Sequence, residues 1–114
     1  MFNLVIDLEM CKVPRDYRSN SYKYATETIQ IGAVLLDDSF KRIGTLCQYV
    51  HPEHGVIDYF IENLTGIKNS QVKNAPKLEE VLLHMIDWLG ERDYKIYAWS
   101  ESDRDQLLHE IKAK

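Results

Sequence analysis

The sequence predicts an α/β fold in which helices pack on a mixed sheet. The apolar segments 2–8, 28–36 and 42–50 have the length and composition of strands. An amphipathic helical pattern follows them, and after it come a fourth apolar segment at 95–98 and a second helical segment. Three early strands followed by alternation give the order β-β-β-α-β-α, which is typical of a mixed sheet flanked by helices.

The segments between the predicted strands contain residues that favour turns and loops. The sequence DDSFK at 37–41 predicts an antiparallel hairpin turn between the second and third strands. Residues 12–26 include Pro14 and Asn20 and show no apolar period, so we expect a loop there. Residues 61–67 are sufficient for only a turn or two of helix.

Two longer helices are predicted after residue 77. Over residues 78–89 the apolar side chains fall on one face of a helix, with a proline shortly before that helix and a glycine directly after it. The last helix is expected over 102–113, where Ser102 and Asp105 have the spacing of a capping box.

Composition limits the classes of protein to which the chain can belong. The 114 residues are enough for a single domain with a modest core. A net charge of −4 argues against non-specific, charge-driven binding to nucleic acid, although catalytic carboxylates would add to the same charge. No apolar stretch approaches the ~20 residues of a membrane helix, and we expect no signal peptide. Cys11 and Cys47 form neither a disulfide framework nor a zinc motif, so we expect reduced thiols and a cytoplasmic protein.

Asp7 and Glu9 lie at the end of the first predicted strand. Because they are two residues apart, their side chains project from the same face of the strand. Like charges this close repel unless a positive charge compensates, and carboxylate oxygens are ligands that Mg²⁺ and Mn²⁺ prefer. The alternative is a strand end that emerges into solvent.

Asp103 begins the last predicted helix. Leu107 and Ile111 follow it at four and eight residues, which places all three on one side of the helix, the side that we expect to face the core. An acid on that side is favoured at the N-terminus by the helix dipole, so helix capping alone is an alternative to a functional role.

Taken together, these acids and the segments around them resemble the DEDD family of 3′-to-5′ exonucleases, particularly the DEDDh branch that trims RNA. Asp7-Leu8-Glu9 resembles the first motif of that family, and ETIQIGAV at 27–34 resembles its second strand. LTGI at 64–67 resembles a short-helix signature, and the Ala-Pro pair before the 78–89 helix resembles the stretch after it. AWSESD at 98–103 resembles the second motif, in which a tryptophan precedes the catalytic aspartate by four residues.

The resemblance implies a ribonuclease-H-like fold in which four acidic residues hold two divalent metals, Mg²⁺ or Mn²⁺. It implies that Asp7 bridges both ions, that Glu9 binds the ion on the side of the attacking water, and that Asp103 supports the site from its helix. Such a site activates the water at one ion and stabilises the leaving 3′ oxygen at the other.

Candidate substrate-binding residues lie close to the acids in the sequence. The resemblance implies that Met10 lies near the terminal nucleotide, with Leu8 and Trp99 as further candidates, and core packing is the alternative for Trp99. In the loop after the first strand, Arg15 and Arg18 alternate with three tyrosines. Cations can bind phosphates and rings can stack on bases, so this loop is a candidate grip for a single strand. A solvated loop is the alternative.

The third motif of the family, a histidine and an aspartate separated by four residues, is not found in this sequence. His109 has Lys114 where the aspartate would stand. We therefore expect a partial exonuclease domain over residues 1–114 that is weakly active or inactive alone, with an open edge on its fourth strand. A second chain could complete that sheet.

The leading hypothesis is a metal-dependent exonuclease domain that acts on single-stranded RNA or DNA 3′ ends. The alternative is a non-catalytic module that binds nucleic acid or protein through the 12–24 loop and the open sheet edge. An unrelated α/β domain, in which the acids are surface charges, is a third hypothesis.

Overall fold

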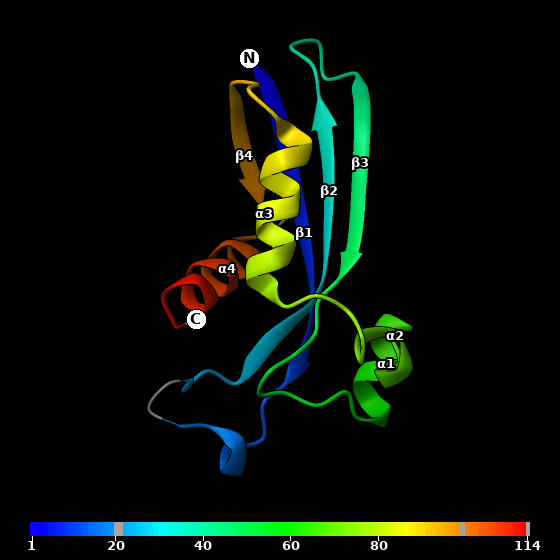
Figure 1. Cartoon of the computed structure of the whole chain (residues 1–114), viewed down its shortest axis with the longest axis vertical. Coiled ribbons are helices and arrows are strands. Elements are labelled where there is room, and N and C mark those ends of the chain that lie inside the picture. Colours follow the sequence, from blue (N-terminus) through cyan, green and yellow to red (C-terminus); the bar gives the residue numbers. More distant parts are fainter. Residues whose placement is uncertain (20–21, 99, 114) are drawn as a thin grey trace.

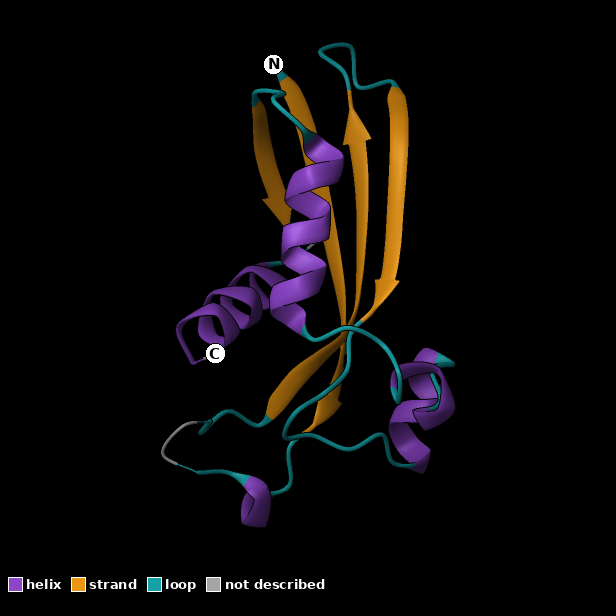
Figure 2. Ribbon diagram, in the orientation of Figure 1, coloured by secondary structure: helices purple, strands orange, loops and turns teal. Residues whose placement is uncertain are grey.

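Within the described part of the chain, four strands form a single mixed sheet, as predicted. The computed structural model describes residues 1–19, 22–98 and 100–113. The strands lie in the order β3-β2-β1-β4 and are β1 (Phe2–Lys12), β2 (Thr26–Leu36), β3 (Arg42–Tyr49) and β4 (Tyr94–Ala98). β1 is antiparallel to β2 and parallel to β4, and β2 is antiparallel to β3 (Figures 1 and 2). Among the described residues β4 pairs only with β1, so its outer edge is open.

β1 and β2 continue beyond their predicted ends as a long twisted ribbon. Gln30 pairs with Glu9 and Thr28 pairs with Met10, so Ile29 has no partner in β1. A bulge of this kind increases the local twist and turns the far end of the ribbon. Lys12 and Thr26, which we expected in a loop, therefore belong to the strands, because the polar residues of this end pair through their backbones.

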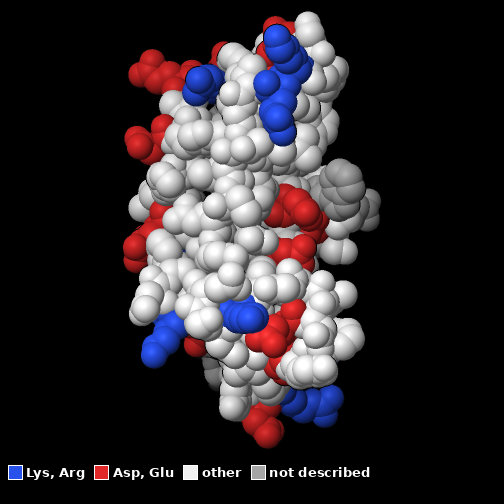
Figure 3. Space-filling view, turned by 90° about the vertical axis from the view of Figure 1, so that its right-hand side faces the viewer, with Lys and Arg blue, Asp and Glu red and all other residues white. Residues whose placement is uncertain are grey.

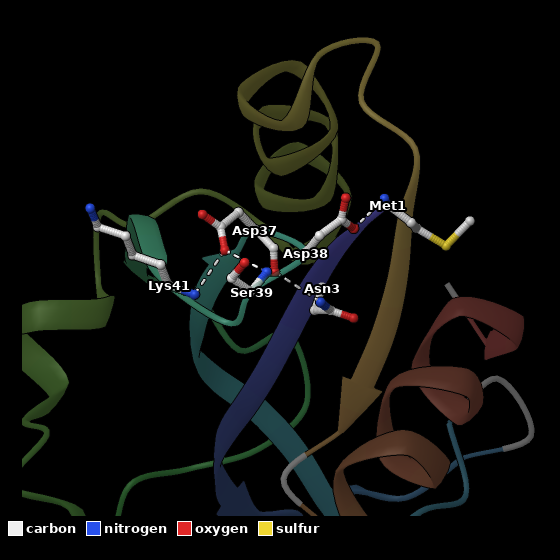
Figure 4. A network of polar contacts seen from close by, with 6 residues as sticks. All are labelled: Met1, Asn3, Asp37, Asp38, Ser39 and Lys41. Carbon is white, nitrogen blue, oxygen red and sulfur yellow. Dashed lines mark hydrogen bonds and ion pairs between the residues drawn. The ribbon is translucent and has the colours of Figure 1, made fainter.

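The predicted hairpin turn joins β2 to β3 and is stabilised by one aspartate. Asp37 Oδ1 accepts hydrogen bonds from the backbone N–H groups of Ser39 and Lys41, both at 2.9 Å (Figure 4). The Asp37 carbonyl accepts a third from Asn3 Nδ2 at 3.1 Å, and the N-terminal amine of Met1 forms an ion pair with Asp38. The turn is thereby tied to the start of β1.

The main hydrophobic core lies between the sheet and helix α3 (Leu78–Leu89). β1 contributes alternate residues to it, which are Leu4, Ile6 and Leu8. The helix contributes the buried side chains predicted from its period, which are Leu78, Val81, Met85 and Leu89. α3 therefore covers one face of the sheet (Figure 1).

A second, smaller core forms where the ribbon turns. Helices α1 (Tyr59–Thr65) and α2 (Asn69–Val72) pack against Cys11 and the bulged Ile29. α1 is as short as expected. Asp58 Oδ1 accepts the N–H of Ile61 at 2.8 Å at its start, and a left-handed glycine ends it.

Helix α4 (Glu101–Ala113) follows β4 directly and begins one residue earlier than predicted. The expected capping pair of Ser102 and Asp105 is wrong, because Ser100 Oγ accepts the N–H of Asp103 at 3.4 Å. The cap thus lies two residues earlier and includes Asp103 itself. In the described ranges, none of the helices has the length and apolar character needed to cross a membrane.

Candidate active site

Asp7 and Glu9 project from the face of β1 that is opposite the main core. Their neighbours Ile6 and Leu8 point into the core, so the alternation of the strand places both acids on the other face. Asp7 is exposed and Glu9 is half-buried. Gly32 pairs with Asp7, so no side chain stands directly opposite this carboxylate on β2. The predicted common orientation of the two acids is consistent with this placement.

Asp103 is brought to these acids by the parallel pairing of β4 with β1. The last pair of that ladder joins Ala98 to Ile6, the residue before Asp7. α4 starts immediately afterwards, and Asp103 lies in its first turn with an exposed fraction of 6 %. Ser100 Oγ lies 3.3 Å from Asp103 Oδ2 and orients this carboxylate. Two segments almost a hundred residues apart therefore supply one group of acids.

The charges of the three carboxylates act on one another. Although the Asp7 side chain is exposed, partial desolvation of its carboxylate raises its pKa above the ordinary value, and the nearby charge of Asp103 raises it further. Burial also raises the pKa of Glu9, with added contributions from Asp7 and Asp103. Across the described residues, none of the ion pairs joins these acids to a lysine or arginine. Negative charge is thus gathered here without a protein cation to balance it.

The donor chemistry of these residues suits a divalent metal, although the ligand atoms of Asp7, Glu9 and Asp103 do not all lie within 4.8 Å of one another in the structure. All three side chains offer hard oxygen ligands, of the kind that Mg²⁺ and Mn²⁺ prefer, and Asp7 is accessible from solvent. On the face seen in Figure 3, several acidic side chains lie down the middle of the molecule, with basic side chains above, beside and below them and further acids along the left edge and at the bottom. The carboxylate oxygens are negatively charged, and none of them is paired with a basic side chain among the described residues. A positively charged metal ion would therefore balance their charge.

Glu27 is a buried acid whose role the sequence did not predict. With an exposed fraction of 0 %, its carboxylate accepts backbone N–H groups from Glu53, His54 and Gly55 at 2.7–2.8 Å. Among the described residues, Glu27, Glu53 and His54 form a cluster of possible metal ligands, because one ligand atom from each lies within 4.8 Å of the others. Because three N–H groups already occupy the Glu27 carboxylate, we assign it to holding the 53–55 loop. The signals in the sequence were its place directly before the predicted second strand and at the start of the segment 27–34, which resembles the second strand of the exonuclease family.

The loop after β1 is more tightly packed than its composition suggested. Arg15 and Arg18 are exposed, Arg15 in a short 3₁₀ turn and Arg18 with its Nε 3.1 Å from the Val13 carbonyl. Two of the three interleaved tyrosines face inwards, however, since Tyr22 is fully buried and Tyr24 stacks on a histidine. Only Tyr17, exposed at 56 %, presents its ring to solvent.

The other candidate substrate residues are differently placed. Met10 is half-buried next to Glu9 on β1. The Leu8 side chain lies in the main core, so any contact that Leu8 makes with a substrate goes through its backbone. Trp99 lies outside the described residues.

None of the four histidines contacts the three acids through the interactions that the structure shows. His51 Nδ1 lies 3.0 Å from the Val72 carbonyl, and His84 Nδ1 lies 2.8 Å from Gln48 Oε1. The rings of the other two stack on tyrosines, and these are His54 and His109. A histidine base is therefore not part of the group.

Comparison with known proteins gives consistent similarities. The sequence matches the RNase_T family model, described as "Exonuclease", over residues 4–107. It is 42 % identical over 62 residues to a "DNA polymerase III PolC-type" of Caldanaerobacter subterraneus subsp. tengcongensis, covering 54 % of this chain and 4 % of that protein. It is 33 % identical over 88 residues to human "ERI1 exoribonuclease 2", covering 75 % of this chain and 12 % of that protein.

A solved structure shows the same fold. The nuclease domain of 3′hExo, described as a DEDDh family member bound to rAMP, superposes with a TM-score of 0.78 at 24 % identity. The superposition covers 97 % of this chain and 58 % of that one, so the chain spans only part of the proteins that it matches. The family match over most of the sequence, together with this fold, shows that the chain belongs to the RNase_T exonuclease family and has the ribonuclease-H-like fold of the DEDDh 3′ exonucleases.

Proposed function

We propose that this chain is a 3′-to-5′ exonuclease domain that hydrolyses phosphodiester bonds at the 3′ ends of single-stranded RNA or DNA. Asp7, Glu9 and Asp103 are its catalytic, metal-binding residues. The observation that supports this proposal best is the convergence of three carboxylates from β1 and α4, none of which forms an ion pair with a lysine or arginine among the described residues. Members of the DEDDh family use divalent metals, and we propose Mg²⁺ or Mn²⁺ for this chain.

The three acids would hold the ions together. The charge of Asp103 on α4 acts on both Asp7 and Glu9 of β1, so all three carboxylates would contribute negative oxygen ligands to the same site. Ser100 restrains the carboxylate of Asp103. Divalent ions bound there would activate a water molecule and neutralise charge on the scissile phosphate. The exposure of Asp7 leaves a route for the substrate from solvent.

The proposed substrate is a single-stranded 3′ end, bound with the help of residues near the acids. Met10 and the backbone of Leu8 adjoin Glu9, and Trp99 remains a candidate from the sequence. Arg15 and Arg18 are exposed cations that are free to approach phosphates. The similarity to an exoribonuclease and to a nuclease domain bound to rAMP favours RNA, and the similarity to a DNA polymerase keeps DNA as a possible substrate.

We propose that residues 1–114 form a single domain with weak or no activity alone. The four histidines have contacts elsewhere, so the described residues supply no histidine base at the acids. The open edge of β4, where Ile96 is exposed, is the place where a second chain would extend the sheet. No disulfide joins the cysteines in the described residues, and we propose a reducing, cytoplasmic setting.

The first experiment is thermal unfolding with and without millimolar Mn²⁺. We expect Mn²⁺ to raise the melting temperature of the wild type, because a ligand that binds only the folded state stabilises it. Asp7→Asn should abolish this increase, whereas Asp87→Asn, an exposed acid on α3, should preserve it. An equal response of wild type and Asp7→Asn would contradict the proposed metal site.

A degradation assay then tests the reaction. Matched single-stranded RNA and DNA labelled at the 5′ end should shorten slowly from their 3′ ends in Mn²⁺, and not at all with Asp7→Asn. A fast reaction of the isolated chain would contradict the proposed weak activity.

The open β4 edge and the exposed Arg15, Tyr17 and Arg18 favour one second candidate, a non-catalytic binding module. For that function, Asp7→Asn and metal removal should both leave nucleic-acid or protein binding unchanged.

A further inference from the structure

Helix α4 buries a stripe of polar side chains that extends from the candidate site towards its other end. Asp103, Gln106 and Glu110 have exposed fractions of 6 %, 6 % and 0 %, and their spacing of three and four residues places them on one side of the helix. Buried polar groups are costly unless they are hydrogen-bonded. The partners of Gln106 and Glu110 therefore determine how this helix is held.

Those partners lie at the start of β2. The Glu110 carboxylate accepts the backbone N–H of Thr28 at 3.0–3.1 Å, and it also accepts the hydroxyl of Thr28. Gln106 Nε2 donates to Glu110 Oε2 at 2.9 Å and to the Thr26 carbonyl at 3.0 Å. Thr26 Oγ1 donates in return to Gln106 Oε1 at 2.6 Å. We call this group of hydrogen bonds the α4 clamp.

The clamp is attached to the part of the sheet that carries Glu9. Thr28 pairs with Met10, the residue after Glu9, across the β1–β2 ladder. The first turn of α4 is attached separately, through the pairing of β4 with β1 beside Asp7. Asp103 thus lies on a helix that is fastened to β1 by the β4 ladder before it and to β2 by the clamp after it.

Apolar packing contributes less to holding α4. Leu107 is half-buried against the core, whereas Leu108 and Ile111 are 48 % and 51 % exposed and line an open groove of about 390 Å³ beside β4. The negative charges of Asp7 and Glu9 oppose the approach of Asp103. A helix with little apolar contact and a repelled acid needs another restraint, and the clamp supplies it.

We infer that Gln106 and Glu110 are positioning residues, which hold Asp103 against Asp7 and Glu9 through the α4 clamp. This inference rests on the proposed metal site. Neither residue touches a metal or substrate. Their effect on the site is exerted through the orientation of α4, so loss of the clamp should weaken metal binding more than it weakens the fold.

The test compares Glu110→Gln with Leu107→Ala. The first variant weakens the clamp, and the second removes apolar contact from the same helix without changing a clamp residue. We expect Mn²⁺ affinity, measured calorimetrically well below each melting temperature, to fall about tenfold in Glu110→Gln, as for other residues that orient metal ligands. It should be close to the wild-type value in Leu107→Ala. If Glu110→Gln does not fold, Thr28→Val removes one donor of the clamp from the other side.

Hydrogen–deuterium exchange gives a second result that does not depend on metal. Exchange should rise over the amides of 103–110 in Glu110→Gln, with no change in α3. If the wild type binds Mn²⁺ and the clamp variants bind it equally well, the inference is overturned. If the wild type binds no Mn²⁺, the proposed function fails, and wild-type exchange in α4 of Glu110→Gln would then overturn the clamp as well.

Discussion

Helices α3 and α4 both contribute to the main hydrophobic core but are held in opposite ways. α3 buries four apolar residues and turns its acids to solvent. α4 buries Asp103, Gln106 and Glu110 and exposes Leu108 and Ile111. One helix is fixed by a non-directional apolar face, and the other by hydrogen bonds of fixed geometry. The helix that carries a candidate catalytic acid is the one that is fixed by directional bonds.

The difference has a physical reason. An apolar face tolerates small rotations and slides of a helix, because its energy depends mainly on buried area. The clamp of Gln106 and Glu110 does not, because donors and acceptors must meet within a few tenths of an ångström. A carboxylate that must meet two other carboxylates at a metal needs the second kind of restraint. α3 thus supports the sheet, whereas α4 positions Asp103, the candidate catalytic acid.

The largest expected effect separates the apolar contacts of the two helices. Leu89→Ala on α3 should lower the free energy of unfolding by about 2–5 kcal/mol, because Leu89 is buried and its removal leaves a cavity. Leu108→Ala on α4 should change it by only about 0.5 kcal/mol, since Leu108 is largely exposed. Urea denaturation of both variants measures the difference. Equal losses of unfolding free energy in the two variants would contradict the conclusion that apolar contacts hold α3 more strongly than α4.

The next effect concerns the clamp. Gln106→Ala removes the Nε2 donor to Glu110 and the Oε1 atom that accepts the Thr26 hydroxyl. It should lower the free energy of unfolding by about 1–3 kcal/mol. Its cost should not add to that of Glu110→Ala, because both belong to one network, and we expect a coupling of about 0.5–3 kcal/mol. A double-mutant cycle by urea denaturation gives this value. A coupling of zero would mean that the two residues act independently.

The sequence predicted the elements whose stability comes from periodic apolar faces. α3 was placed at its observed bounds because its period is regular and a glycine ends it. The far end of the β1–β2 ribbon was missed because its residues, such as Lys12 and Thr26, are polar and pair through the backbone. Backbone pairing leaves no pattern of side chains in the sequence.

The candidate site was predicted from residue types and order, and its support was not. Asp7, Glu9 and Asp103 were chosen from their spacing and family resemblance, and the pairing of β4 with β1 brings them together. For α4, we expected Leu107 and Ile111 to accompany Asp103 towards the core, and Ile111 is instead exposed. The β2 residues that bond to Gln106 and Glu110 are 80 or more residues away from them in the sequence, so no local pattern indicates these contacts.

The smallest effect concerns the repulsion at the start of α4. Asp7 and Glu9 have pKa values raised above their ordinary 3.8 and 4.5, so the folded chain holds their protons more tightly than the unfolded chain. Between the ordinary and the raised pKa, stability must therefore fall as pH rises, and above the raised pKa the loss is complete. Asp7→Asn should remove the part of this stability loss that comes from Asp7. The metal-free variant should therefore be slightly more stable than the wild type at neutral pH.

The measurement is the difference in unfolding free energy between Asp7→Asn and wild type across the acid range. This difference should be near zero below the ordinary pKa of aspartate and should grow in favour of the variant as pH rises. A constant difference for Asp7→Asn would mean that neither desolvation nor the charge of Asp103 raises the pKa of Asp7, and the repulsion that calls for a directional restraint on α4 would then be absent. A rising difference that Mn²⁺ reverses would show that this helix trades stability for a metal site, which α3 does not.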